Sequence, residues 1–247
     1  MNLTRSYRRG IGRVYIDEDK REYPSVTTVL GSTLKPGVWL ESWQKRMMRD
    51  KFHEMYEVAA LKGAEPEEVY EIHDAALAYP NKYRDNAGAV GTRIHKALEA
   101  YFTDQPVSQY ITEDPRIKGV LKAAAVWEAE TQLEPVNVEY YLASQKHNYA
   151  GTVDLICHQH DNRQLSLIDF KSGSVQPQQL LQLAAYSIAY QEQNGQRPDT
   201  AMFVKVDIEK GTIKEVEPKL SYHEISQYFD LFLKALSLWK WRTLKQF

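Results

Sequence analysis

The segment LIDFKSG, residues 167–173, places a carboxylate and an ammonium group two residues apart in an otherwise apolar run. Side chains alternate between the two faces of a β-strand, so Asp169 and Lys171 are predicted to point the same way. A second acid, Asp154, lies in the preceding apolar segment YAGTVDLICH. A buried carboxylate is costly unless it is paired, hydrogen-bonded or bound to a metal ion. The pattern therefore predicts a polar site within a buried sheet.

Two interpretations of this site follow from the charges alone. If Asp154 and Asp169 converge, their repulsion raises the pKa of one of them unless a cation lies between them. That cation could be the ammonium of Lys171, or a divalent ion such as Mg²⁺ or Mn²⁺. The structural alternative is an Asp169–Lys171 ion pair that serves only stability, with Asp154 hydrogen-bonded to backbone groups.

Further candidate residues lie in neighbouring segments. His95 and Glu99 are one turn apart in the helical segment GTRIHKALEAYF, and Gln182 and Tyr186 are one turn apart in the helix after Lys171. Glu139 lies in VEYY, on the first of three predicted strands. Histidine is a better ligand for Mn²⁺ than for Mg²⁺. We assign Glu99 to packing or capping and keep the other four as site candidates.

The hydrophobic patterns and turn signals predict the order of the elements. We expect a hairpin over 12–23, a helix capped by Ser25, helices over 38–61, from 66, over 84–102 and over 115–133, strands over 136–143, 149–158 and 164–171, a helix over 177–193, strands over 200–208 and 211–217, and a helix over 221–243. This order predicts an α/β (α+β) fold, with a mixed β-sheet flanked by helices and an N-terminal helical lobe. The expected division is a mainly helical lobe, 1–133, that contributes the site histidine, and a core, 134–247, packed as a single compact unit.

The composition excludes several classes of protein. Of the 247 residues 43% are hydrophobic and 26% charged, as in ordinary globular proteins, and no apolar run approaches the roughly 20 residues of a membrane span. The single cysteine, Cys157, rules out a disulfide framework and a cysteine-ligated iron–sulfur cluster. The net charge of −2 argues against indiscriminate nucleic-acid binding. We expect an intracellular, cytoplasmic protein.

The site candidates together resemble a known family. His95, then Gly151-Thr152-Val153-Asp154, then Asp169-Phe170-Lys171, then Gln182 to Tyr186 is similar, in that order, to the RecB-type branch of the PD-(D/E)XK nuclease superfamily. A closer resemblance, to the mitochondrial genome maintenance exonuclease family and its bacterial and phage relatives, is carried by YPSVTTVL at 23–30, LESWQKRMM at 40–48 and GTRIHKALEAYF. It covers about residues 20–200.

This resemblance implies a restriction-endonuclease-like core and metal-dependent hydrolysis of phosphodiester bonds in DNA. It implies that Mg²⁺ or Mn²⁺ is held by His95, Asp154, Asp169, the backbone carbonyl of Phe170 and, in support, Glu139. Lys171 would position or deprotonate the attacking water, and Gln182 and Tyr186 would orient the lysine or contact DNA. The expected products carry 5′-phosphate and 3′-hydroxyl ends.

The resemblance also suggests the substrate and the partners. The expected substrate is single-stranded DNA with a free end, in replication, repair or recombination, and a replication or recombination protein is the expected partner class. Trp39, Trp43 and Tyr56, with nearby basic residues, are either a stacking platform for such a strand or core residues behind a solvated face. The alternatives are a RecB-like nuclease that acts on duplexes or flaps with a partner, and a catalytically silent DNA-binding module.

Overall fold

The computed structural model describes residues 2–34, 38–159 and 164–244. The side chain of Trp39 lies outside the described part. The helices and strands of the chain, in order, are β1 (Thr4–Arg8), β2 (Gly12–Ile16), β3 (Glu22–Pro24), α1 (Val26–Thr33), α2 (Val38–Ala60), α3 (Pro66–Phe102), α4 (Ser108–Glu113), α5 (Ile117–Thr131), β4 (Leu133–Ser144), β5 (Tyr149–Gln159), β6 (Gln164–Lys171), α6 (Gln178–Asn194), β7 (Thr200–Asp207), β8 (Thr212–Ser221) and α7 (Tyr222–Leu244).

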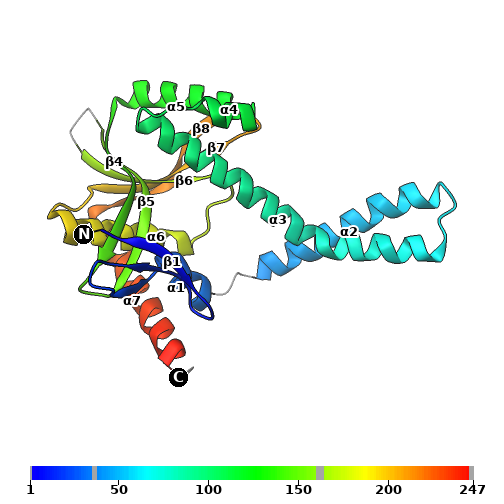
Figure 1. The fold of residues 1–247 in the computed structure, drawn as a ribbon, viewed down its shortest axis with the longest axis horizontal. Helices are drawn as coiled ribbons and strands as arrows, with labels where there is room; N and C mark the ends of the chain where they lie inside the picture. The colour runs from blue at the N-terminus through cyan, green and yellow to red at the C-terminus, as the bar shows by residue number, and fades with distance from the viewer. Residues whose placement is uncertain (1, 35–37, 160–163, 245–247) are drawn as a thin grey trace. The chain divides into compact units, whose positions relative to one another are not determined.

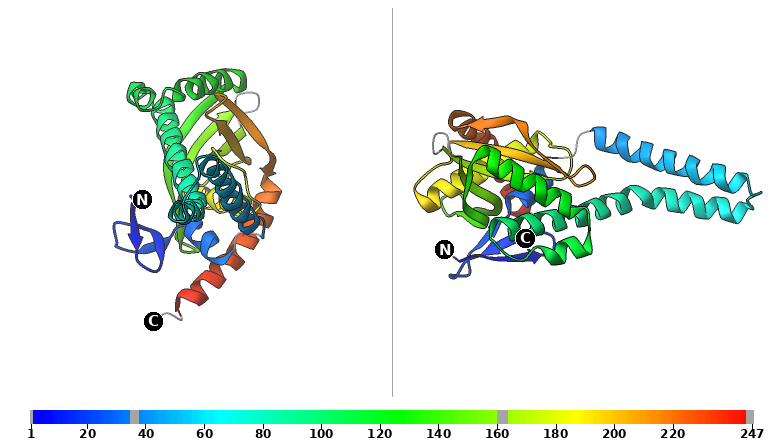
Figure 2. Two further views of the ribbon diagram at one scale, coloured as in Figure 1. Left: turned by 90° about the vertical axis from the view of Figure 1, so that its right-hand side faces the viewer. Right: turned by 90° about the horizontal axis from the view of Figure 1, so that it is seen from above.

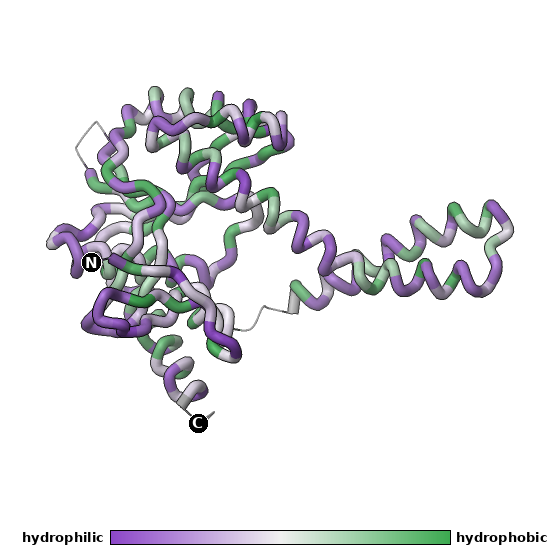
Figure 3. The backbone as a smooth tube through the Cα atoms, viewed as in Figure 1, coloured by the Kyte–Doolittle hydropathy of each residue, from purple (hydrophilic) through white to green (hydrophobic). Residues whose placement is uncertain are grey.

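The chain packs as two units, which we call the sheet unit (1–34 with 93–247) and the helical pair (35–92). In the helical pair, α2 runs antiparallel to the first part of α3 (Figure 1), and the ring centres of Trp43 and Tyr83 lie 6.0 Å apart between them. Polar and apolar residues alternate along both helices (Figure 3), as expected of a pair with one solvated side. The division expected after residue 133 stays a prediction, because the packing of a folded chain does not test which segments fold independently.

The sheet unit contains the predicted mixed sheet, in the strand order β4-β5-β6-β7-β8. All neighbours are antiparallel except β6 and β7, which are parallel and joined through α6. Helices α6 and α7 cover one face, and α5 with the end of α3 covers the other (Figures 1 and 2). The fold class predicted from the sequence is therefore confirmed.

The N-terminal part of the chain shows one success and two differences. The expected N-cap is confirmed, because Ser25 Oγ accepts the Thr28 N–H at 3.0 Å. The expected hairpin is the antiparallel β2–β3 pair, but β1 adds a third strand that the sequence did not reveal. The two helices expected between 66 and 102 are one continuous helix, α3, which runs through Pro80.

The core explains why charged residues stand out in the central strands. Every residue of β6 between Leu165 and Phe170 is buried, and β5 is buried on both faces along most of its length. Strands covered on both faces read as continuous apolar runs, so a buried acid or base in them needs a specific partner. Among the described helices, none is long and apolar enough to cross a membrane.

Candidate active site

The candidate site lies where the ladder between β5 and β6 ends. The last register pair is Leu155 with Ile168. Beyond it, the Asp154 side chain takes over from the backbone: its Oδ2 accepts the Phe170 N–H at 2.6 Å. The ladder with β5 thus ends at a carboxylate, whereas the residues from Asp169 to Lys171 stay paired with β7 on their other side.

Asp169 and Lys171 point the same way, as the alternation on a strand predicts. Lys171 Nζ lies 2.5 Å from Asp169 Oδ2, and Asp169 is only 3% exposed. The other oxygen, Oδ1, accepts from Gln182 Nε2 at 2.9 Å, and the same amide nitrogen lies 3.2 Å from the Tyr186 hydroxyl. The structure therefore joins the predicted Asp-x-Lys strand to both predicted residues of α6.

A second group combines residues from three elements. His95 Nδ1, on α3, lies 3.2 Å from Asp154 Oδ1 on β5 and 4.0 Å from Glu139 Oε1 on β4. One ligand atom from each of these three side chains fits within 4.8 Å of the others, which is the spacing of a metal-ion site. Asp154 connects the two groups, because one oxygen contacts His95 and the other contacts the β6 backbone.

An aromatic cluster on the opposite face of β6 holds His95 in place. The Phe170 ring stacks on Phe102 at 6.1 Å and meets Trp127 edge-on at 6.3 Å. The His95 ring lies 6.5 Å from the same Phe170 ring. Since Phe102 is on α3 and Trp127 is on α5, this packing fixes the end of α3 against β6. We infer that Phe170 positions the histidine through its side chain and Asp154 through its N–H.

Glu139 reaches the site from an unusual backbone conformation. Its φ of +46° is in the left-handed region, which is costly for a residue with a Cβ. It lies in β4 between the register pairs Val138–Leu155 and Tyr140–Val153, across from Asp154. Strained backbone of this kind persists where the surrounding structure enforces it, and it is common at functional sites.

The glycine of the G-x-x-D motif has a packing role that the sequence did not reveal. A Cβ at Gly151 would lie 2.2 Å from Tyr186 Cε1, far inside van der Waals contact. Tyr186 is buried, at 4% exposure, so its ring cannot move into solvent. Gly151 therefore makes room for the ring whose hydroxyl contacts Gln182. Phe203 is another residue near the site that no motif indicated, and its ring centre lies 5.5 Å from Lys171 Nζ.

Burial and nearby charges raise the pKa values of three groups in the site. Burial raises the pKa of Asp169 to about 6, since Lys171 offsets only part of that effect and Asp154 adds to it. Burial and the charge of Asp154 raise the pKa of Glu139 to about 7. Burial lowers the pKa of His95, but the hydrogen bond to Asp154 and the charges of the surrounding acids outweigh it and raise the pKa to about 9. Each of these three pKa shifts favours the protonated form, through burial and mutual repulsion for the two carboxyl groups and through nearby acids for the histidine.

The donor set fits a divalent cation. Carboxylate oxygens suit Mg²⁺ and Mn²⁺, and the imidazole favours Mn²⁺. The structural alternative is also visible in part, since the Asp169–Lys171 pair and the bond from Asp154 to a backbone N–H are both present. It does not explain why His95 and a strained Glu139 converge on Asp154. The predicted Phe170 carbonyl ligand stays a prediction, because the contact found in this structure is made by the N–H of that residue.

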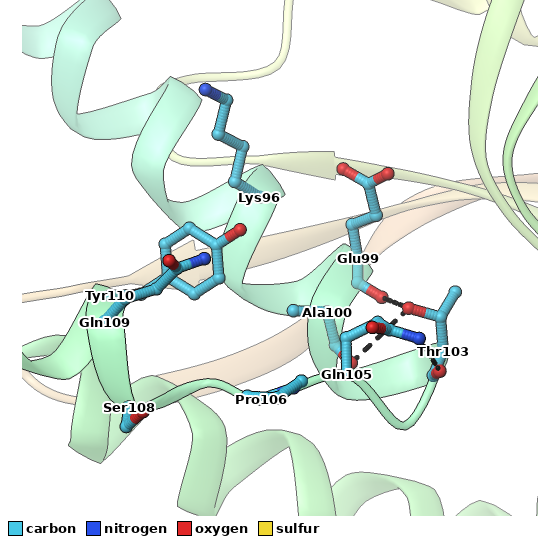
Figure 4. Close-up of a pocket in the computed structure, with 9 residues that line it drawn as sticks. All are labelled: Lys96, Glu99, Ala100, Thr103, Gln105, Pro106, Ser108, Gln109 and Tyr110. Atoms are coloured by element: carbon cyan, nitrogen blue, oxygen red, sulfur yellow. Dashed lines mark hydrogen bonds between the residues drawn. The ribbon is translucent and has the colours of Figure 1, made fainter.

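A polar pocket of about 410 Å³ lies further along α3 from His95. Lys96 and Glu99 extend from α3 at this pocket, and Tyr110 of α4 lies across from them (Figure 4). Glu99 is exposed, not packed as expected, although its backbone carbonyl accepts the Thr103 hydroxyl at 2.7 Å. The charge of Glu99 contributes to the raised pKa of Glu139, so the acidic region continues toward this pocket.

Fold and site together define a class. A mixed sheet flanked by helices, with an Asp-x-Lys strand beside a second aspartate and a candidate metal group, is the architecture of a nuclease core. The family described as the PD-(D/E)XK nuclease superfamily matches residues 56–242, and the chain belongs to that superfamily.

Two further comparisons add little to this assignment. A crystal structure from Eubacterium rectale, described as that of a candidate exonuclease, is similar with a TM-score of 0.40 and 6% sequence identity. The match covers 59% of this chain and 64% of that chain, so this chain spans less than two thirds of the length of that protein. Among curated proteins, none matches.

Proposed function

We propose that this chain is a metal-dependent exonuclease of the RecB-like type that hydrolyses phosphodiester bonds in DNA, with a preference for single strands that have a free end. The observation that carries the proposal is the buried Asp169–Lys171 pair next to the His95, Glu139 and Asp154 group. The group of His95, Glu139 and Asp154 offers oxygen and nitrogen ligands for a cation. The Asp169–Lys171 pair places an ammonium next to that group. This pairing is what metal-assisted attack of water on a phosphate requires.

The residues have distinct roles in this proposal. Asp154, Asp169 and His95 would hold Mg²⁺ or Mn²⁺, with Glu139 and the Phe170 carbonyl in support. When bound, the ion would lower the pKa of a coordinated water and polarise a phosphoryl oxygen. Burial, with the charge of Asp154 in addition, raises the pKa values of Glu139 and Asp169, and a bound cation would oppose both shifts.

Lys171 is the proposed catalytic residue next to the metal-binding group. Its ammonium would orient the attacking water and offset the charge that develops on the phosphate. Water adds to phosphorus, the bond from phosphorus to the 3′-oxygen breaks, and that oxygen takes a proton, which leaves 5′-phosphate and 3′-hydroxyl ends. Gln182, which bonds Asp169 directly, and Tyr186, which contacts Gln182, are positioning residues in this scheme.

The substrate preference is supported by the family resemblance and by the composition of the helical pair. Tyr56 is 41% exposed, and its ring stacks on Phe52 at 5.7 Å. Helix α2 also carries Arg46 and Arg49, and the combination of aromatic rings with cations is the one used to bind single strands. We expect the protein to act inside the cell in DNA replication, repair or recombination, with a replication or recombination protein as partner.

The experiment uses single-stranded oligonucleotides blocked at the 5′ end, the 3′ end, both or neither, together with closed single-stranded circles. We expect digestion in Mn²⁺ or Mg²⁺ that needs a free end, stops with a chelator and is lost in Lys171→Ala. The matched control is Lys122→Ala, which removes the same charge from an exposed position on α5. Cutting of closed circles would overturn the exonuclease assignment, and activity of folded Lys171→Ala equal to the control would overturn the assigned role of the lysine.

A further inference from the structure

Three lysines lie side by side across the second half of the sheet. The register pairs Lys171 of β6 with Lys205 of β7, and Lys205 with Lys214 of β8. Residues paired directly on neighbouring strands project from the same face. The Phe203 ring next to Lys171 Nζ belongs to that face as well, since Phe203 precedes Lys205 by two residues. We call Lys171, Lys205 and Lys214 the lysine row.

The lysine row carries uncompensated charge. Like charges directly opposite each other on adjacent strands are destabilising. Lys171 is paired with Asp169, but Lys205 and Lys214 are exposed and have no ion pair or side-chain hydrogen bond within the described ranges. A charged side chain on β8 is a common defence of an edge strand. The protection of an edge strand does not explain Lys205, because β7 is an interior strand. The other residues of β7 from 201 to 206 are all buried.

A pocket of about 420 Å³ opens next to the lysine row. The loop that follows Lys171 and the start of α6 form one side, and β7 and β8 form the other. Its lining is mostly apolar and includes Val175, Pro177, Leu180, Val216 and Pro218, and its polar members are Ser174, Gln176, Lys205 and Glu217. The one acid in the lining, Glu217, accepts the Lys219 N–H at 3.0 Å, so that oxygen is already bonded to backbone. The pocket thus combines an apolar interior with a free cation at its border.

We propose that the lysine row binds the phosphates of the substrate strand next to the scissile bond, and that the pocket receives the base of one unpaired nucleotide. The proposal rests on the proposed nuclease function and adds the direction that the strand takes: from Lys171 across β7 to β8. A nucleotide is the ligand class that matches both features, because it joins an anionic phosphate to a flat ring that stacks on apolar surface. Lys205 and Lys214 are binding residues here, whereas Lys171 also acts at the reacting phosphate.

The test measures affinity separately from cleavage. A labelled single-stranded oligonucleotide is titrated with full-length protein in a chelator, and Kd is followed by fluorescence anisotropy over a series of salt concentrations. Each phosphate contact contributes about 0.7 to the slope of log K against log salt for single strands, which corresponds to about a fivefold change in Kd at ~0.1 M salt. We expect Lys205→Ala and Lys214→Ala each to show this loss. Lys122→Ala, with the same charge change on α5, should match wild type.

The base pocket has its own readout. An abasic position is moved along the oligonucleotide, and we expect one position near the cleaved bond at which affinity falls for wild type. At that position the loss should be smaller in Lys205→Ala, because coupled contacts are not additive. Equal affinity at all abasic positions would show that the pocket does not bind a base. If the Kd values and salt slopes of both lysine variants equal those of Lys122→Ala, the lysine row does not bind the phosphates. Failure of either leaves the nuclease function standing as long as digestion still depends on Lys171.

Discussion

The two halves of the five-stranded sheet carry opposite charge around the end of β6. On one side, β4, β5 and the end of α3 bring Glu139, Asp154 and His95 together, with the pKa of each resolved group shifted toward keeping its proton. On the other side, β6, β7 and β8 align three lysines. Asp169 lies between the two halves and contacts the first lysine.

Under the proposed function, this separation lets one sheet bind two ligands. A cation is favoured where carboxylates are buried together, and a phosphate is favoured where ammonium groups are unpaired. If the acids and lysines served only stability, the two sets would neutralise each other across the strands, as cross-strand ion pairs usually do. Within the described residues, the lysine row forms no ion pair with the acids of β4 and β5, and the Asp169–Lys171 pair lies within β6 itself. The lysines of β7 and β8 therefore stay separate from the acids of β4 and β5, which is the arrangement expected if two ligands complete the site.

The largest effect should come from removing the acid that joins both groups. In Asp154→Asn we expect kcat/KM to fall by about three orders of magnitude, equivalent to ~4 kcal/mol, because a ligand of the ion is lost while an oxygen remains to accept the Phe170 N–H. Mn²⁺ affinity, measured by calorimetry, should fall with it.

A matched variant separates this loss from a structural effect. Asp199 Oδ2 accepts the Leu165 N–H at 2.9 Å at the other end of β6, so Asp199→Asn makes the same change at an exposed acid that also contacts the β6 backbone. It should retain metal affinity and activity. If both variants behave alike, Asp154 serves the strand and not the ion, and the contrast between the two halves of the sheet loses its functional meaning.

The next effect should be on stability, at the contact that positions α6. Gly151→Ala places a methyl group 2.2 Å from Tyr186 Cε1, and overpacking in a closed core costs about 1–3 kcal/mol. We expect the free energy of unfolding in urea to fall toward the upper end of that range. Gly173→Ala, where an added Cβ meets no atom within 4 Å, is the control. Equal stability of the two variants would show that the Tyr186 ring is not held as the structure places it.

The sequence predicted the strands of the five-stranded sheet and helices α6 and α7 well, because these elements carry strong hydrophobic patterns and clear turn signals. The family resemblance also grouped His95, Asp154, Asp169, Lys171, Gln182 and Tyr186 into one candidate site, and the structure brings these residues together. The sequence could not show the strained backbone of Glu139, the Phe170 cluster that holds His95, or the lysine row. These depend on strand register and on side chains from distant segments, which leave no local pattern. Trp43 shows the same limit, because its spacing alone could not identify Tyr83 as its neighbour.

The smallest effect should be the response of stability to pH, which tests the acidic half alone. Folding raises the pKa of Asp169 from 3.8 to about 6, of Glu139 from 4.5 to about 7 and of His95 from 6.5 to about 9. In each case the folded state binds the proton more tightly. The stabilisation from each group is therefore fully present below its pKa in the unfolded chain. It is lost as the pH rises through the pKa of the same group in the folded protein.

We therefore expect metal-free protein to lose melting temperature as pH rises from about 5.5 to about 8.5, and Mn²⁺ to restore more of it at the higher pH, because a bound ion replaces the protons that are lost. Glu139→Gln is the sharpest comparison, since it removes one of the three groups and should flatten the decline below about pH 7. Thermal unfolding by circular dichroism, with and without Mn²⁺, measures both. A melting temperature that rises over this range in the metal-free protein, or an equal gain from Mn²⁺ at both pH values, would contradict the raised pKa values assigned to this half of the sheet.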